Sequence, residues 1–112
     1  MIEMIYESRP EFHPGAMAFA YEFEARHISI FYDRVKAAST RQNRADVLGH
    51  VLAHEIAHLL QRTNYHAAAG VMKKEWDHQD YRRMCVRPLS FTPFDVQLIY
   101  GGMRKAEISG HP

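Results

Sequence analysis

The segment from residue 46 to residue 60 constrains the fold most, because it combines an apolar helical pattern with histidines. Apolar residues recur there at helical spacing, no proline interrupts it, and Asp46 is a candidate N-cap. His54 and His58 lie four residues apart, so both imidazoles project from one helix face about one turn apart. A buried neutral histidine needs partners for both ring nitrogens, and one shared metal ion satisfies a nitrogen of each. The segment therefore predicts a metal-binding helix.

Glu55 lies between the two histidines and is rotated from His54 by about 100° around the helix axis. Its carboxylate would therefore face a water at the metal rather than the metal itself. Zinc lowers the pKa of a water that it holds to about 7 and polarises a substrate carbonyl, while a nearby carboxylate moves the proton. The pattern predicts a hydrolytic site with Zn2+ as cofactor, His54 and His58 as metal ligands and Glu55 as the catalytic general base.

A catalytic zinc site needs a third protein ligand and one open position for water. The candidates downstream of the helix are His66, Glu75, Asp77, His78 and Asp80. We favour His66, because imidazole is a common zinc ligand and the polar residues 63–65 before it are typical of a chain reversal. Glu75 stays open as an alternative: it would serve if a second helix lay antiparallel to the first, as in thermolysin-like sites.

The stretch HEIAHLLQRTNYHAAAGVM resembles the metzincin signature, His-Glu-x-x-His-x-x-Gly-x-x-His followed by a Met-turn, in its matrix-metalloproteinase form. The upstream stretches GAMAFAYEF and HISIFYD resemble the edge strand and inner strand of that family, so the similarity spans roughly residues 15 to 76. It is nearest to the short stand-alone metzincin-like domains of bacteria. The resemblance implies His54, His58 and His66 as zinc ligands, Glu55 as general base, and Met72 beneath the metal. It also implies that residues 73–91 set specificity.

Gln61 stands where the family has the glycine that ends the helix, and two extra residues separate His58 from His66. The reversal is therefore expected to use a residue such as Asn64, which tolerates a left-handed backbone.

The rest of the chain predicts a small α+β domain over residues 1–112, with a short sheet on the metal-binding helix and a C-terminal helix. An irregular stretch to Pro14 precedes two hairpin-like strands, AMAFAYEF and HISIFY, and one of these can pair with an extended substrate. A short helix or polar loop follows, and residues 71–84 include a helical stretch with Trp76 in the core. Thr92-Pro93-Phe94-Asp95 is a helix start, and that helix runs to about residue 100 or 104. Its inward residues would be Phe94, Leu98 and Ile99.

His50 continues the spacing of the metal-binding histidines, but it lies about 12 Å along the axis from His58, too far to share an ion. We expect it to support the site or to lie on the surface. Cys85, the one cysteine, excludes an internal disulfide and is expected to be a buried core residue rather than a latency thiol. The remaining histidines are expected on the surface: His13, His27, His78 and His111.

A net charge of +1 and a charged fraction of 24% argue against a nucleic-acid partner, so the basic pairs at 73–74 and 82–83 are expected to be solvated. No apolar run of about 18 residues predicts a membrane span, and the acidic N-terminal stretch is unlike a signal peptide. Compartment and oligomeric state stay open.

The function expected from these residues is a zinc-dependent metalloendopeptidase acting on a peptide or protein substrate. Two alternatives use the same residues: a zinc-binding module without turnover, and a zinc amidase that acts on a non-peptide carbonyl.

Overall fold

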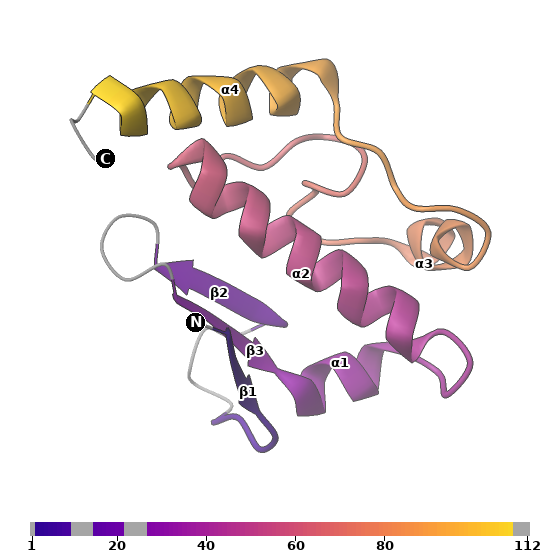
Figure 1. The fold of residues 1–112 in the computed structure, drawn as a ribbon. Helices are drawn as coiled ribbons and strands as arrows, with labels where there is room; N and C mark the ends of the chain where they lie inside the picture. Colours follow the sequence, from indigo (N-terminus) through magenta and orange to yellow (C-terminus); the bar gives the residue numbers. More distant parts are fainter. Residues whose placement is uncertain (1, 10–14, 22–26, 109–112) are drawn as a thin grey trace.

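Helix α2 (Arg44–Gln61) runs through the middle of the molecule, with a sheet on one side and helix α4 (Pro93–Ile108) on the other (Figure 1). The computed structural model describes residues 2–9, 15–21 and 27–108. In these ranges the other elements are strands β1 (Ile2–Ile5), β2 (Ala18–Tyr21) and β3 (His27–Phe31) and helices α1 (Tyr32–Ala38) and α3 (His78–Met84). The chain therefore has an α+β fold, as predicted, and α2 is the element that every layer contacts.

The sheet has the strand order β1-β3-β2. Strand β2 pairs antiparallel with β3, with Ala18 opposite Ile30, which confirms the two predicted strands. Strand β1 pairs parallel with β3, with Ile2 opposite Ile28, so the prediction of an irregular stretch up to Pro14 is wrong for residues 2–5. Residues 2–5 are too short to show a period, and nothing local in a sequence encodes a parallel pairing partner. This topology leaves β2 at one end of the sheet.

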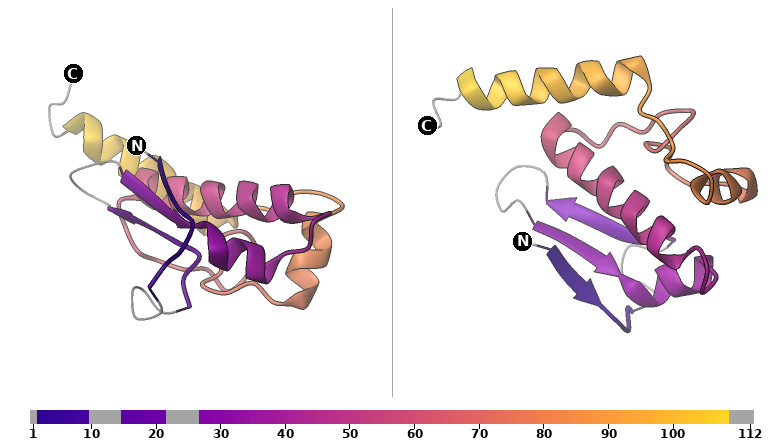
Figure 2. Two further views of the ribbon diagram at one scale, coloured as in Figure 1. Left: turned by 90° about the horizontal axis from the view of Figure 1, so that it is seen from below. Right: turned by 45° about the vertical axis from the view of Figure 1, so that its right-hand side comes forward.

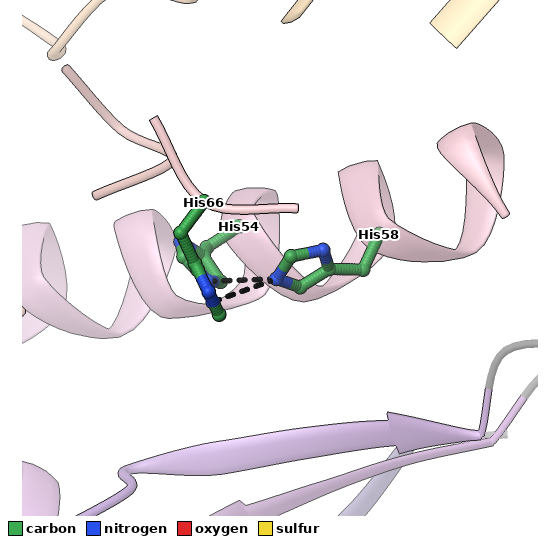
Figure 3. Close-up of side chains that lie close together, drawn as sticks. All are labelled: His54, His58 and His66. Carbon is green, nitrogen blue, oxygen red and sulfur yellow. Dashed lines mark hydrogen bonds between the residues drawn. The ribbon is translucent and has the colours of Figure 1, made fainter. Parts of the chain in front are cut away.

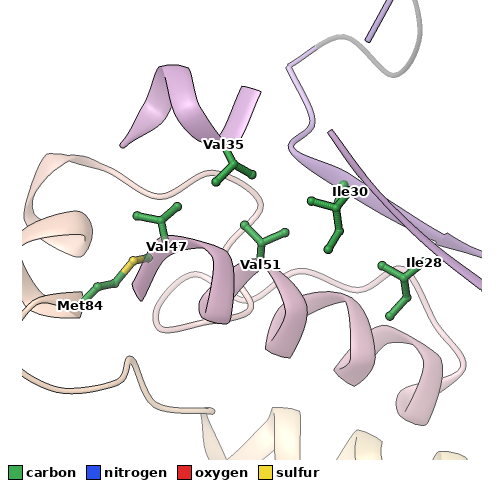
Figure 4. Packing of buried hydrophobic residues seen from close by; sticks show 7 residues of the cluster. Ile28, Ile30, Val35, Val47, Val51 and Met84 are labelled. Carbon is green, nitrogen blue, oxygen red and sulfur yellow. The ribbon is translucent and has the colours of Figure 1, made fainter. Parts of the chain in front are cut away.

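The main core lies between α2 and the sheet (Figure 4). Val47 and Val51, one helical turn apart, bury their side chains there against Ile28 and Ile30 of β3. Val35 of α1 and Met84 of α3 complete this cluster, and Ile30, Val35 and Val47 have no exposed surface. The core therefore packs one face of α2 against the sheet. Another face of α2 contributes to a second cluster.

That second cluster consists of Ala57, Ala67, Val71 and Met72. It lies where α2 meets the loop that follows it. Trp76 packs against both clusters, which confirms its predicted place in the core. The two clusters thus fix the C-terminal half of α2 and the loop from residue 67 to residue 72 relative to each other.

Both ends of α2 differ in detail from the prediction. Asn43, not Asp46, is the N-cap residue, and Asp46 lies in the first turn, where its charge favours the positive end of the helix dipole. At the other end Arg62, not Asn64, takes the left-handed conformation, with φ 58°. The Arg62 N–H donates to the His58 carbonyl at 2.9 Å, so the reversal begins directly after the last helical residue, Gln61.

Helix α4 begins at the predicted position. The Thr92 hydroxyl accepts from the Asp95 N–H at 3.1 Å, and the Asp95 carboxylate accepts from the Thr92 N–H at 2.8 Å. The helix is longer than expected, and Phe94, predicted to face inward, is 48% exposed and contacts Tyr65 instead. Helix α4 lies across the C-terminal end of α2, on the side away from the sheet (Figures 1 and 2).

Two further predictions about the C-terminal third need correction. The helix expected within residues 71–84 covers only α3, because the Asp77 side chain caps it at residue 78. Cys85 follows directly after α3 and is exposed, not buried as predicted. None of the helices in the part of the chain that the structure describes has the length and apolar character that a membrane crossing requires.

Candidate metal centre

Three imidazole rings meet at the C-terminal half of α2 (Figure 3). His54 and His58 come from the helix, and His66 comes from the loop after it. One ring nitrogen from each residue lies within 4.8 Å of the others. The Nε2 atom of His58 is 3.1 Å from Nε2 of His54 and 3.3 Å from Nε2 of His66. The structure thus brings together the three histidines that the sequence suggested.

A short loop returns His66 to the helix. After the reversal at Arg62, the Ala67 N–H donates to the Met72 carbonyl at 2.9 Å, and Ala67 forms a parallel bridge with Lys73. Gly70, at the turn of this loop, has φ +81°, a conformation that strains any residue with a Cβ. These contacts close the loop on itself. The backbone hydrogen bonds that position His66 therefore come from residues near it in the sequence.

Backbone carbonyls fix the tautomers of the two helical histidines. The Nδ1 atom of His54 lies 2.7 Å from the Val71 carbonyl oxygen, and Nδ1 of His58 lies 3.0 Å from that of Thr63. A carbonyl only accepts, so each Nδ1 carries the proton and each neutral ring turns an Nε2 lone pair towards the other. Two lone pairs at 3.1 Å repel each other unless a cation lies between them.

Burial keeps these rings neutral. It lowers the pKa of His58 from 6.5 to about 4, with further lowering by the neighbouring rings of His54 and His66. Burial is also the largest cause that lowers the pKa of His54 and of His66. A proton is therefore a poor candidate for a cation between these nitrogens, whereas a metal ion binds neutral imidazole directly.

The spacing fits a tetrahedral ion. Ligand nitrogens at a zinc–nitrogen distance of about 2.0–2.1 Å lie roughly 3.3 Å apart in tetrahedral geometry. The two Nε2 distances from His58, 3.1 and 3.3 Å, come close to that value, and the ligand nitrogens of all three residues lie within 4.8 Å of one another. A three-histidine set suits zinc and also copper, iron or nickel, so the donor atoms indicate a class of metal.

Glu55 lies beside the three rings. Its carboxylate oxygen Oε2 is 4.0 Å from Nε2 of His54, and the residue is only 7% exposed. Burial raises the pKa of Glu55 from 4.5 to about 7. A carboxyl group with a pKa near 7 both accepts and returns a proton readily at neutral pH, which is what a general base requires.

Two groups at the centre carry no sequence signal: the Val71 and Thr63 carbonyls. Every residue has a carbonyl, so a sequence pattern cannot show which one will meet a ring nitrogen. The Trp76 ring lies nearly perpendicular to the His54 ring, with 6.0 Å between the two ring centroids. Met72, next to Val71, has no exposed surface, so the second core cluster lies directly behind the centre.

The other acidic candidates do not join this group in the described part of the chain. The Asp80 carboxylate accepts from Nζ of Lys73 at 2.6 Å and from the Asp77 N–H at 2.8 Å, and Asp77 caps α3. Lys73 was predicted to be solvated and is instead held by this carboxylate. Glu75 and His78 are exposed and lie outside the cluster.

His50 is a supporting residue rather than a member of the centre. Its Nδ1 donates to the Asp46 carbonyl at 2.7 Å, and its Nε2 accepts from the Leu89 N–H at 3.0 Å. Both ring nitrogens are therefore satisfied by the backbone. The residue ties α2 to the loop after α3 and supports the fold. It is buried, so the expectation of a surface position is wrong, and neither of these bonds reaches the three histidines.

No family model, no curated protein and no solved structure matches this chain significantly. Function must therefore be inferred from the residues of the centre.

Proposed function

We propose that the chain is a small zinc-dependent peptidase of metzincin type, with His54, His58 and His66 holding the metal and Glu55 as general base. The observation that carries this proposal is the convergence of neutral imidazole nitrogens beside a buried carboxyl group with a pKa of about 7. A structural zinc site is closed by four protein ligands, whereas three histidines leave a position open for water or substrate. The donor set therefore favours a reactive centre over a structural one.

Zinc in such a centre supplies Lewis-acid chemistry, which activates water and polarises a carbonyl. The residues of the chain carry the proton. Glu55 would take a proton from the attacking water and deliver it to the departing amine. Burial raises its pKa, which favours holding that proton, and the charge of a bound cation favours the ionised form that accepts it. The carbonyls of Val71 and Thr63 hold the His54 and His58 rings in the tautomer whose Nε2 faces the centre.

Strand β2 supports a peptide as the substrate rather than a small amide. Within the described sheet, β2 is an end strand, and it packs against α2, the helix that carries the centre. An extended peptide can add to such an edge through its own backbone hydrogen bonds, an interaction that a small non-peptide amide cannot make. The edge thus offers a place for a substrate backbone beside the reactive residues.

The test compares zinc content and peptide hydrolysis in four proteins purified without chelator: wild type, His66→Ala, Glu55→Gln and the control His78→Ala. His78 is an exposed histidine outside the cluster, so its loss should change neither property. We expect about one zinc per chain in wild type, a large loss in His66→Ala, and full zinc content in Glu55→Gln. Hydrolysis of a mixed peptide library should fall about a hundredfold or more in Glu55→Gln.

Each part of the proposal has its own contradicting result. Zinc-free wild type would remove the metal centre, and unchanged zinc in His66→Ala would remove His66 as a ligand. Appreciable hydrolysis by zinc-loaded Glu55→Gln would remove Glu55 as the base. A zinc-loaded wild type that cleaves no peptide would favour a zinc-binding module or an amidase for other substrates.

A further inference from the structure

A second feature lies beside the metal centre: a pocket of about 700 Å³ between the loop at Gly70 and the end of α3. None of the three histidines lines it, and neither does Glu55. Three of its lining residues are arginines, Arg82, Arg83 and Arg87. The pocket is therefore separate from the proposed reaction, and its chemistry is set by a different group of residues.

These guanidinium groups have no partner in the described part of the chain. The ion pairs and side-chain hydrogen bonds there include none of Arg82, Arg83 and Arg87. The one acid that lines the pocket, Asp80, is already held by Lys73 at 2.6 Å and by the Asp77 N–H. The lining therefore presents uncompensated positive charge, and arginines clustered in this way attract anions.

The pocket also has an apolar side. Val86, one of its lining residues, is 80% exposed, the highest value among the large exposed hydrophobic residues of the described chain. Leu89 adds a second aliphatic surface. A ligand that satisfies both parts of the pocket carries a negative head on a short aliphatic stem. Carboxylate on such a stem matches the planar fork of a guanidinium, which binds it through two parallel hydrogen bonds.

The loop at residues 70 and 71 borders both the pocket and the metal centre. Gly70 and Ser90 both line the pocket and lie directly against each other, since a Cβ at Gly70 would run into the Ser90 carbonyl. The next residue, Val71, donates its N–H to the same Ser90 carbonyl at 3.0 Å and offers its own carbonyl to His54. A ligand in the pocket thus lies one residue away from the backbone group that orients a proposed metal ligand.

We propose that this pocket binds a carboxylate on a short aliphatic stem, held by the guanidinium groups that line it, among them Arg83 and Arg87. An acidic side chain of a peptide substrate and a free dicarboxylic acid share this chemistry. Only the peptide source rests on the proposed function, because the arginines and the pocket do not depend on hydrolysis.

The test has one arm for each source. It uses the zinc-supplemented 112-residue chain with Glu55→Gln throughout, so that no peptide is cleaved. In the first arm, calorimetry measures the binding of glutarate and of its uncharged analogue glutaramide. In the second arm, the affinity of paired peptides is measured, each pair differing by Glu or Gln at one position. Both arms compare three proteins: no further change, Arg83→Gln with Arg87→Gln, and the charge-matched control Arg41→Gln with Arg104→Gln. Arg41 and Arg104 are exposed and do not line the pocket.

We expect the charged ligand to bind more tightly than its neutral partner in at least one arm, and added salt should weaken it. The pocket variant should lose about tenfold or more of that affinity, while the control keeps it. A preference for glutarate alone identifies a free acid as the ligand, and a preference for Glu peptides identifies the substrate. The proposal is overturned if no charged ligand is preferred in either arm, or if the pocket variant and the control lose affinity equally. Because binding alone is measured, a protein that proves to have no peptidase activity leaves this result intact.

Discussion

Burial moves the pKa of Glu55 and of the histidines beside it in opposite directions, because it disfavours the charged form of both. The carboxyl group becomes harder to ionise and the imidazoles become harder to protonate. Without metal, the centre therefore tends towards neutrality on all its groups. A bound cation would reverse this balance by favouring an ionised Glu55 and neutral rings together, which is the state that the proposed reaction starts from.

The metal-free protein should show the cost of ionising Glu55. The pKa of this group is about 7 in the folded chain and near its ordinary 4.5 when unfolded, so between these values the folded state holds more protons. The free energy of unfolding therefore falls as pH rises from 4.5 to 7. Glutamine at position 55 cannot ionise, so the free energy of unfolding of Glu55→Gln should not show this fall. The stability advantage of the variant over wild type should therefore be larger at pH 8 than at pH 4.5, by on the order of 2 kcal/mol.

Urea unfolding of both proteins with chelator at the two pH values measures this difference. The lowered pKa values of His54 and His58 act with the opposite sign, since their contribution to stability is lost as pH falls below 6.5. That contribution is common to both proteins and cancels in the comparison. An equal stability difference at pH 4.5 and pH 8 would contradict a raised pKa for Glu55.

Exposure of single side chains was harder to predict than their chemistry. The spacing of His54, Glu55 and His58 is local to one helix, so the shared face of the two histidines and the position of Glu55 beside that face followed from the helical period. Whether Cys85 or Phe94 is covered depends on elements distant in sequence, and both are exposed against expectation. Residue type alone favours burial for each, and tertiary packing overrides that preference here.

Cys85 provides a direct check of this correction. Because the residue is exposed, a water-soluble disulfide reagent should modify the folded protein to about the same extent without denaturant as with it. Absorbance at the released thiolate band gives the extent in each case. If modification required denaturant, Cys85 would be buried and the prediction from the sequence would stand.

At the scale of elements, the close approach of α4 to the end of α2 requires a glycine at position 102. Gly102 is buried, and a Cβ there would run into the Leu60 carbonyl oxygen and lie 2.8 Å from the Gln61 carbonyl carbon. The backbone of α4 thus passes directly over the last turn of α2. The sequence gives no sign of this contact, because a close approach between two distant backbones has no local pattern.

Alanine substitutions at the two neighbouring glycines should have opposite effects. Gly101→Ala meets nothing within 4 Å and should raise the free energy of unfolding by up to about 1 kcal/mol, the usual gain of alanine over glycine in a helix. Gly102→Ala gains the same propensity but forces α4 away from α2, and should lower stability by about 1–2 kcal/mol. Equilibrium urea unfolding compares them, and two variants of equal stability would exclude the close approach.

The elements that the sequence predicted best are those with a local signal at their ends. Helix α4 has its capping residues Thr92 and Asp95, and the region of α2 was marked by its apolar period. Strand β1 has neither capping residues nor a visible period. Its pairing partner, residues 28–31 of β3, lies far away in the sequence. The left-handed turn also fell on Arg62 rather than Asn64, although residue preference alone favours asparagine in that conformation.

For the whole molecule, a metal ion would join the two core clusters more firmly. His54 and His58 belong to the helix packed on the sheet, whereas His66 belongs to the loop that carries the second cluster. A ligand that binds only the folded state adds its binding free energy to the stability of the chain, about 4 kcal/mol at a thousandfold excess over its dissociation constant. In a chain of 112 residues this is a large share of the total.

Zinc should therefore raise the melting temperature of the chelator-treated protein by about 10 °C or more. The increase should be much smaller in His66→Ala and unchanged in His78→Ala. Differential scanning calorimetry with and without added zinc gives the values. A rise of the same size in all three proteins would indicate zinc binding elsewhere on the chain.

The position of the three histidines along the chain also bears on the order of folding. His54, His58 and His66 belong to one helix end and the loop that directly follows it, whereas β1 must find β3 across a separation such as Ile2 to Ile28. Closing a short segment loses less chain entropy than closing a long one, and contacts of low sequence separation form faster. The ligands can thus assemble while the parallel strand pair is still open, and a metal ion present from the start would nucleate the fold rather than only complete it.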